Sequence, residues 1–232
     1  MTTEQTVTWP TGYRINPRVQ GPDKEFIEAF RSIPVPVAGD CSGRSLGAIG
    51  LRAYHGNPQT VLCGPAITVR IRPGDNLMIH KAMLMAQPGD IIVIDGGGDV
   101  SQALVGGLMR TTAIARKLGG FVIDGAIRDL VEWAEGGMPI FAKGNTHRGP
   151  SKDGPGMINV PVSCSGLVVN PGDLVLGDAD GVIAVPVEDL SWLLAAAQAH
   201  LKKEATIRAQ NASGNSDVER FDSMLRQKGL PI

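Results

Sequence analysis

The chain lacks the features that mark several large classes of protein. Its 232 residues carry 22 Lys and Arg against 23 Asp and Glu, so no excess of positive charge is available for nucleic acid or an anionic membrane surface. No run approaches the ~18 apolar residues of a membrane helix, and Met1 to Val7 lacks the basic and apolar regions of a signal peptide. The three cysteines are odd in number and form no CxxC pair, which favours a reduced compartment. We therefore expect a cytoplasmic protein that binds neither nucleic acid nor membrane.

Several motifs of known enzymes are also missing. The four histidines form no HxxxH or HExxH pattern, which argues against a zinc site. No GxSxG occurs, and the cysteines have no nearby basic partner, so an acyl-transfer nucleophile is not supported. The glycines at 96–98 follow an apolar run but make neither GxGxxG nor a P-loop. A tight turn between a strand and a helix is therefore favoured there over a nucleotide site.

Glycine and proline, by contrast, are plentiful: 30 Gly and 16 Pro lie between apolar runs and predict tight turns in a strand-rich fold. The middle of the chain alternates strand and helix patterns, and the C-terminal third consists of consecutive strand patterns. This order predicts a layered α/β domain with mixed strand pairing. We expect an N-terminal arm over 1–22, a single domain over 23–210, and a C-terminal tail with a helix over 211–232.

Apolar periodicity gives the expected elements. Strands are predicted at 60–72, 90–95, 120–124, 139–143, 157–163, 166–169, 173–177 and 181–186. Helices are predicted at 23–33, 40–50, 75–86, 101–117, from near Arg128 to 136, from 187 to about 210, and at 218–228.

The most informative segment runs from Gly106 to Glu132. Gly106-Gly107 opens a predicted helix, and free backbone N–H groups at a helix start bind anions. A short strand follows and leads through Gly125 into the adjacent pair Arg128-Asp129. On its own, Arg128 pairing with Glu132 across one helical turn would be worth only roughly 0.2–0.5 kcal/mol and would need no function. Together with the Gly-Gly helix start, however, the segment predicts a site for a small carboxylate or phosphate.

The spacing of this segment is that of a known family. Gly107, twenty intervening residues, Arg128-Asp129, two more residues and Glu132 together resemble the RraA-like family. This family includes the 4-hydroxy-4-methyl-2-oxoglutarate and 4-carboxy-4-hydroxy-2-oxoadipate aldolases, and also the regulator of ribonuclease E activity A. Three blocks, 90–98, 122–129 and 171–182, carry the resemblance further, so that it covers roughly residues 25–210.

The resemblance implies a fold, an assembly and a set of roles. The fold would be a three-layer β/β/α sandwich of the swivelling-domain type with a long C-terminal helix, assembled as a homotrimer or homohexamer with sites between subunits. Arg128 would contact the keto-acid substrate, and Asp129 would bind a divalent metal, Mg²⁺ or Mn²⁺. The backbone at the preceding helix start would hold the pyruvate carboxylate, which places substrate-binding roles on Gly106, Gly107, Leu108 and Met109.

The resemblance also bears on three positions at which the family's aldolases carry acidic residues. The aldolases usually carry Asp or Glu twenty-one residues before the Arg, where this chain has Gly107. Glu132 matches an acidic residue of the aldolase group that the ribonuclease regulator lacks; this match favours an enzyme and makes Glu132 a second candidate for metal binding beside Asp129. A carboxylate from a neighbouring subunit's C-terminal helix approaches the metal in the family, and Glu204 is the candidate for it here.

These implications predict a metal-dependent lyase that cleaves a 4-hydroxy-2-oxo acid to pyruvate and a second oxo acid. Oxaloacetate decarboxylation is an expected side activity, because it passes through the same pyruvate enolate. Two alternatives remain open. One is a Schiff-base aldolase with Lys143 as the amine, and the other is a non-enzymatic regulator that binds an RNA-degradation partner.

Overall fold

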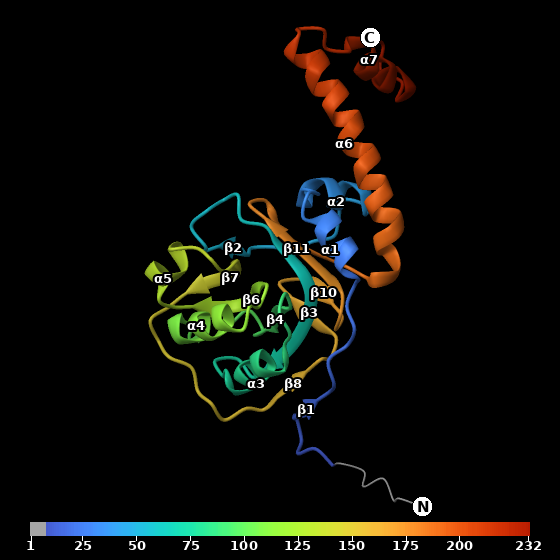
Figure 1. Cartoon of the computed structure of the whole chain (residues 1–232). Coiled ribbons are helices and arrows are strands. Elements are labelled where there is room, and N and C mark those ends of the chain that lie inside the picture. The colour runs from blue at the N-terminus through green and yellow to red at the C-terminus, as the bar shows by residue number, and fades with distance from the viewer. Residues whose placement is uncertain (1–7) are drawn as a thin grey trace, which may run out of the picture.

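The fold is built around one mixed sheet, seen in a computed structural model that describes residues 8–232 (Figure 1). The residues at which we excluded a signal peptide, 1–7, lie outside the described residues. Four parallel strands form the centre of the sheet, and shorter strands extend its edges, in the order β1-β8-β3-β4-β6-β7-β2. These strands are β1 (Arg14–Ile15), β2 (Arg52–Ala53), β3 (Leu62–Ile71), β4 (Ile91–Asp95), β6 (Gly120–Ile127), β7 (Ile140–Asn145) and β8 (Gly156–Ile158).

One face of this sheet is covered by helices. Alternate residues of a strand point to opposite faces, and in β4 Ile92 and Ile94 belong to the apolar cluster on the helical side. Their partners in that cluster include Ile79 and Met83 of α3 and Met109 of α4. The helices on this side of the core are α3 (Leu77–Met85), α4 (Gly107–Ala115) and the short α5 (Leu130–Ala134).

The opposite face is covered by a second layer of strands. Ile91 and Val93, the other residues of β4, pack in a separate cluster with Val162, Val169 and Val175. This layer consists of β9 (Val162–Cys164), β10 (Leu167–Val169), β11 (Leu174–Asp178) and β12 (Gly181–Val185). The order of layers is therefore strand, strand, helix, which confirms the predicted β/β/α arrangement.

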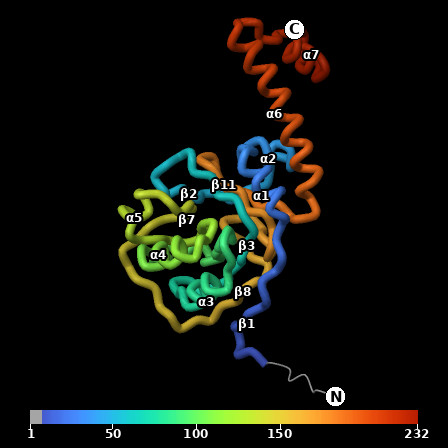
Figure 2. Tube along the Cα trace, viewed as in Figure 1, coloured from blue at the N-terminus to red at the C-terminus, as the bar shows by residue number. Residues whose placement is uncertain are grey.

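Further helices lie on the outer side of β11 and β12, where Leu174 and Leu176 form a third cluster with Phe30, Leu190 and Leu193. The helices are α1 (Lys24–Phe30), α2 (Val35–Cys41) and the first part of α6 (Leu190–Ala212), which follows a 3-10 turn at Val187–Asp189. Beyond this contact α6 extends away from the body and ends beside α7 (Val218–Gln227) (Figures 1 and 2). No helix within residues 8–232 has the length and apolar character needed to cross a membrane.

Two predicted helices were wrongly placed. The second helix lies at Val35–Cys41 rather than 40–50, because Pro34 is its N-cap and Pro36 lies in its first turn. Proline is tolerated in a first helical turn, where its missing N–H would have no partner in any case. The helix predicted from 101 begins only at Gly107, since Ala103–Val105 forms a strand, β5, that pairs with the end of β6.

The N-terminal arm is fastened to the body by a strand and an ion pair. β1 pairs in parallel with β8. Farther along, the Arg18 guanidinium donates two hydrogen bonds of 2.7 Å to the Asp90 carboxylate. That carboxylate is 1% exposed and also accepts the N–H of Gln87 at 2.8 Å. The Arg18 side chain thus neutralises a buried charge at the start of β4.

Arg18→Ala should therefore lower the free energy of unfolding by about 3 kcal/mol, because it leaves the Asp90 carboxylate buried without its cation. Arg44→Ala is the matched control, since Arg44 forms an exposed pair with Asp40 and should change the free energy by less than about 0.5 kcal/mol. Urea denaturation of both variants measures the difference. Equal losses would contradict the assigned role of the buried pair.

Candidate functional site

The end of β6 and the start of α4 are brought together by strand pairing. β5 runs parallel to the last residues of β6, with Val105 opposite Ile127. The N–H of Arg128 donates to the carbonyl of Val105 at 3.0 Å, which continues the pairing by one residue. Residues about twenty positions apart in the sequence therefore meet at one edge of the sheet, with α4 starting at Gly107.

Asp129 links these two ends directly. Its backbone lies in the left-handed region, with φ 63° and ψ 45°, a conformation that Asp and Asn adopt more readily than most residues. In this conformation its Oδ2 accepts the N–H of Gly107 at 2.8 Å. The carboxylate therefore lies at the N-terminus of the nine-residue helix α4, where the helix dipole favours a negative charge.

The Arg128 side chain points toward the Asp129 carboxylate at the start of α4. Its Nε lies 3.5 Å from Oδ2 of Asp129, and both side chains are 40% exposed. Its carbonyl accepts the indole N–H of the buried Trp133 at 3.0 Å, which fixes the backbone of the turn before α5. Within the described part of the chain Arg128 forms no ion pair with Glu132, so a simple helical pair does not account for it.

The carboxylate of Glu132 lies against Gly107. A Cβ atom built on Gly107 would collide with both carboxylate oxygens of Glu132, and one built on Gly106 would lie 2.6 Å from Oδ2 of Asp129. The two glycines therefore let two carboxylates approach the first turn of α4. Gly107 stands where the family's aldolases usually have an acid, and here Glu132 occupies the space that such a side chain would need.

The amide donors at this helix start are only partly free. The N–H of Gly107 is used by Asp129, and the N–H of Met109 donates to the carbonyl of Gly106 at 3.0 Å. The N–H of Leu108 makes no hydrogen bond within residues 8–232. Leu108 is therefore the amide best placed to receive an anion, and its side chain is 84% exposed beside the site.

A cavity of about 130 Å³ opens beside Arg128. Its walls come from the starts of α3 and α4, from β5 and from the loop before β8. Two of the lining side chains, Arg128 and Lys152, are basic, and none is a carboxylate, which suits an anionic ligand. The lining residues are Asn76, His80, Ala103, Leu104, Val105, Gly106, Leu108, Met109, Arg128, Pro150 and Lys152.

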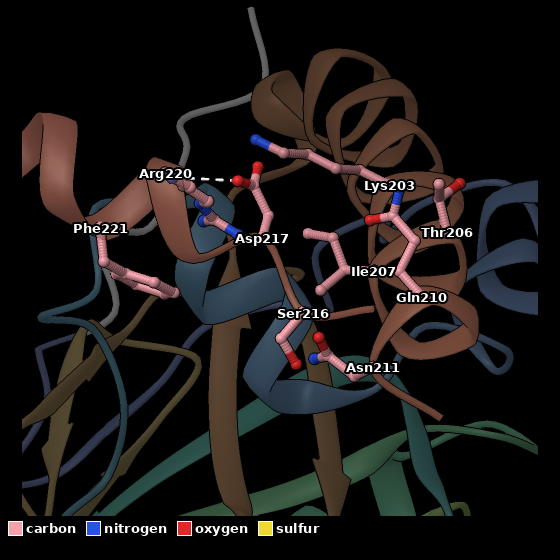
Figure 3. A pocket seen from close by; sticks show the side chains of 9 residues that line it. All are labelled: Lys203, Thr206, Ile207, Gln210, Asn211, Ser216, Asp217, Arg220 and Phe221. Atoms are coloured by element: carbon pink, nitrogen blue, oxygen red, sulfur yellow. Dashed lines mark hydrogen bonds between the residues drawn. The ribbon is translucent and has the colours of Figure 1, made fainter. Parts of the chain in front are cut away.

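A larger groove, of about 470 Å³, lies between α6 and α7 (Figure 3). Apolar Ile207 and Phe221 line it together with polar side chains. Its Asp217 caps α7 by accepting the N–H of Arg220 at 3.0 Å. None of the predicted site residues lines this groove, so we place the candidate functional site at the cavity beside Arg128.

The structure thus brings together most of the predicted site residues, namely Gly106, Gly107, Leu108, Met109, Arg128, Asp129 and Glu132. Glu204 lies elsewhere in the chain, on α6, where it contacts His200 and Arg208 and lines a hollow beside α2. No set of three or more His, Cys, Asp and Glu side chains that could hold a metal ion is found in the part of the chain that the structure describes.

Lys143 also lies apart from this cavity. Its Nζ is 3.2 Å from Oδ1 of Asp124, which accepts the hydroxyl of Ser165 at 2.7 Å as well. The cysteines are unsuited to nucleophilic chemistry, because burial raises the pKa of the Cys63 thiol to about 11 and raises the pKa of Cys164 too.

Two polar lining residues, Asn76 and His80, were missed by sequence reasoning. The order of strands and helices along the chain could have indicated that these residues lie at the site. Helices that follow parallel strands begin at the same edge of the sheet, where ligands bind in open α/β folds. The start of α3 after β3 could therefore have been placed beside the start of α4.

Fold and site together define a layered α/β protein in which an arginine, two carboxylates and the start of a helix meet at one edge of the sheet. The chain belongs to the RraA-like family, described as Aldolase/RraA, whose family model matches residues 38–184. The matched range contains α4, β6 and α5, and so the whole Gly107 to Glu132 segment.

The relatives include proteins named as aldolases and a structure from an inhibitor family. A protein of Halalkalibacterium halodurans with the provisional name 4-hydroxy-4-methyl-2-oxoglutarate aldolase is 40% identical over 195 residues, which cover 84% of this chain and 90% of that protein. The 4-hydroxy-4-methyl-2-oxoglutarate aldolase of Thermus thermophilus is 33% identical over 48% of this chain and 68% of that protein. The crystal structure of Streptomyces coelicolor RraAS2, an unusual member of the RNase ES inhibitor RraA family, matches with a TM-score of 0.74 at 28% identity, covering 82% of this chain and 98% of that one.

Substitutions at Asp129 should separate the stability that comes from its hydrogen bond and backbone conformation from the effect of its charge. Asp129→Ala removes the acceptor for the Gly107 N–H and places alanine in the left-handed region, so it should cost about 1–2 kcal/mol of unfolding free energy. Asp129→Asn keeps both an acceptor and a residue that tolerates this backbone, and should stay within about 0.5 kcal/mol of the parent protein. Urea denaturation compares the two, and equal stability of both variants would rule out the structural role.

Proposed function

We propose that this protein is a divalent-metal-dependent aldolase that cleaves a 4-hydroxy-2-oxo acid into pyruvate and a second oxo acid. The observation that carries the proposal is the meeting of Arg128, the Asp129 carboxylate and the start of α4 beside one cavity. The names of the Halalkalibacterium and Thermus relatives support this reaction class.

The pyruvate end of the substrate would bind at the start of α4. The N–H of Leu108 and the positive end of the helix dipole suit its carboxylate. Arg128 lies beside the same helix turn and would neutralise the negative charge that develops on the 2-oxo oxygen as the C3–C4 bond breaks. Charge stabilisation by such a preorganised group is strong because part of the site is shielded from water.

The residues present fit Mg²⁺ or Mn²⁺. Asp129 uses one carboxylate oxygen for Gly107 and Arg128, and the Glu132 carboxylate lies over the adjacent glycine. Mg²⁺ is commonly held by one or two carboxylates, with water and substrate oxygens completing its shell. When bound, such a cation supplies Lewis-acid polarisation of the 2-oxo group. In a homotrimer or homohexamer, Glu204 of a neighbouring copy would be a further acidic contact.

The same arrangement extends to oxaloacetate, whose decarboxylation also leaves the enolate of pyruvate. Arg128 would stabilise that charge in the same way, so we propose decarboxylation as a side activity. A Schiff-base route through Lys143 has less support, because its ammonium is paired with Asp124 and lies outside the cavity lined by Arg128.

A regulator is the second candidate function, favoured by the similarity to the Streptomyces inhibitor-family structure. A protein of that kind would bind an RNA-degradation partner without metal and without turnover. The carboxylates gathered at α4 argue for the enzyme, because a binding surface alone does not require Glu132 and Asp129 to crowd two glycines.

The proposed reaction predicts metal-dependent release of pyruvate. A lactate dehydrogenase-coupled screen over several 4-hydroxy-2-oxo acids should show turnover with Mg²⁺ or Mn²⁺, loss with EDTA, and recovery on adding the metal back. Arg128→Ala should lower kcat by about 10²–10³-fold, the range found on removing one group that stabilises an oxyanion. Arg44→Ala, remote from the cavity, should leave turnover unchanged.

Unchanged cleavage by the Arg128→Ala variant would contradict the assignment. Borohydride trapping of a substrate adduct on Lys143 would replace it with the Schiff-base route. Absence of turnover with every substrate, together with metal-independent capture of a ribonuclease complex, would favour the regulator.

A further inference from the structure

His80 forms part of the α3 wall of the cavity that Arg128 lines. Its side chain is partly buried, and within residues 8–232 its ring makes no hydrogen bond and no ion pair. It follows Asn76, the residue that precedes the first turn of α3, by four positions, and both residues line the cavity. An imidazole with no structural partner on a cavity wall is available to a ligand.

Asn76 provides an independent sign that this wall faces a ligand. It is 4% exposed, and its Nδ2 donates to the carbonyl of Leu104 at 2.9 Å, which fixes the orientation of the amide. Its Oδ1 is buried with no hydrogen-bond partner among the described residues. A buried acceptor without a donor costs free energy, and a ligand that donates a hydrogen bond would remove that cost.

The charges around His80 keep its imidazole neutral. Burial and the nearby Lys152 ammonium both lower the pKa of His80 below its usual value, and Arg128 lines the same cavity. The other charged side chains on the strands and turns packed against α3 form ion pairs with one another, Arg70 with Asp95 and Arg72 with Asp75. Lys81, on α3 itself, is exposed. No carboxylate lines the cavity to favour the protonated ring.

The two sides of the cavity therefore differ in polarity. The side formed by Arg128 and the Leu108 N–H donates hydrogen bonds, whereas the α3 side carries the neutral imidazole of His80 as an acceptor, with the Lys152 ammonium near it. A 4-hydroxy-2-oxo acid has the complementary order, with acceptor oxygens on C1 and C2 and a donor hydroxyl on C4. The cavity, of about 130 Å³, corresponds to roughly four water molecules at about 30 Å³ each, so a small ligand that enters it lies close to both sides.

We propose that His80 is the catalytic base of the cleavage, an inference that rests on the proposed function. The neutral imidazole takes the proton of the C4 hydroxyl, the C4–O bond becomes a carbonyl, and the C3–C4 bond breaks. Its electron pair forms the enolate of pyruvate, and the imidazolium returns its proton to C3. Atoms and charge balance without any further reactant, and His80 ends the cycle neutral.

His80→Gln tests this role, because glutamine keeps a polar side chain of similar reach but transfers no proton near neutral pH. We expect kcat to fall by about 10²–10⁴-fold, the usual contribution of general acid–base catalysis, with KM changed only a few-fold. His147→Gln is the control, since His147 is exposed in the same loop as Lys152. Circular dichroism and thermal unfolding verify that each variant is folded.

Two readouts distinguish a base from a structural residue. In the parent enzyme kcat should fall as the pH drops through the pKa of His80, because the protonated ring cannot accept a proton, and this acidic limb should vanish in His80→Gln. Exchange of the pyruvate methyl protons with D₂O, followed by NMR, should be lost in parallel. Free imidazole should restore part of the activity to His80→Ala.

The outcomes separate this inference from the proposed function. If the parent protein releases pyruvate but His80→Gln keeps its kcat and its acidic limb, the role of His80 is wrong and the aldolase stands. If Glu132→Gln removes the acidic limb and His80→Gln does not, Glu132 is the base. If the parent protein cleaves no 4-hydroxy-2-oxo acid, both proposals fall.

Discussion

The site depends on one hydrogen bond, from the N–H of Gly107 to the carboxylate of Asp129 at 2.8 Å. It joins the start of α4 to the end of β6, two points that parallel pairing of β5 and β6 has already brought close. Asp129 reaches this position only with a left-handed backbone, and that turn also sets the direction of Arg128 and the start of α5. Loss of this hydrogen bond would therefore displace the Arg128 guanidinium, the Asp129 and Glu132 carboxylates and the cavity wall together.

Glycine at 106 and 107 is the second constraint, and it follows from the first. The carboxylates of Asp129 and Glu132 lie so close to the first turn of α4 that a side chain at either position would require them to move. An acid at 107, as the family's aldolases usually have, would compete with Glu132 for the same space. With glycine at 107, this chain keeps the acid on α5, Glu132, and lacks the one that the family's aldolases usually have at the start of α4.

Much of the fold could be predicted because apolar runs and turns are local. The strands at 62–71, 91–95 and 120–127 are rich in apolar and β-branched residues, and their mixed pairing followed from the order of strands and helices. The helix at 35–41 was missed because Pro36 can either end a helix or occupy its first turn. Asn76, His80 and Lys152 join the site only through tertiary packing. Glu204 lies on α6, away from Asp129 in the same chain, and its proposed contact in a neighbouring copy would require an assembly that no pattern within one chain fixes.

The proposed aldolase requires the Asp129 carboxylate to hold a divalent cation at the start of α4. Titration of Mn²⁺ into the native assembly, followed by electron paramagnetic resonance with and without pyruvate, tests it most directly. The account predicts saturable binding that tightens with pyruvate, and at least a tenfold loss of affinity in Asp129→Asn, which keeps the fold but not the charge. Asp180→Asn, at an exposed turn, should bind as the parent does. Equal Mn²⁺ affinity in the parent protein and Asp129→Asn would contradict the account.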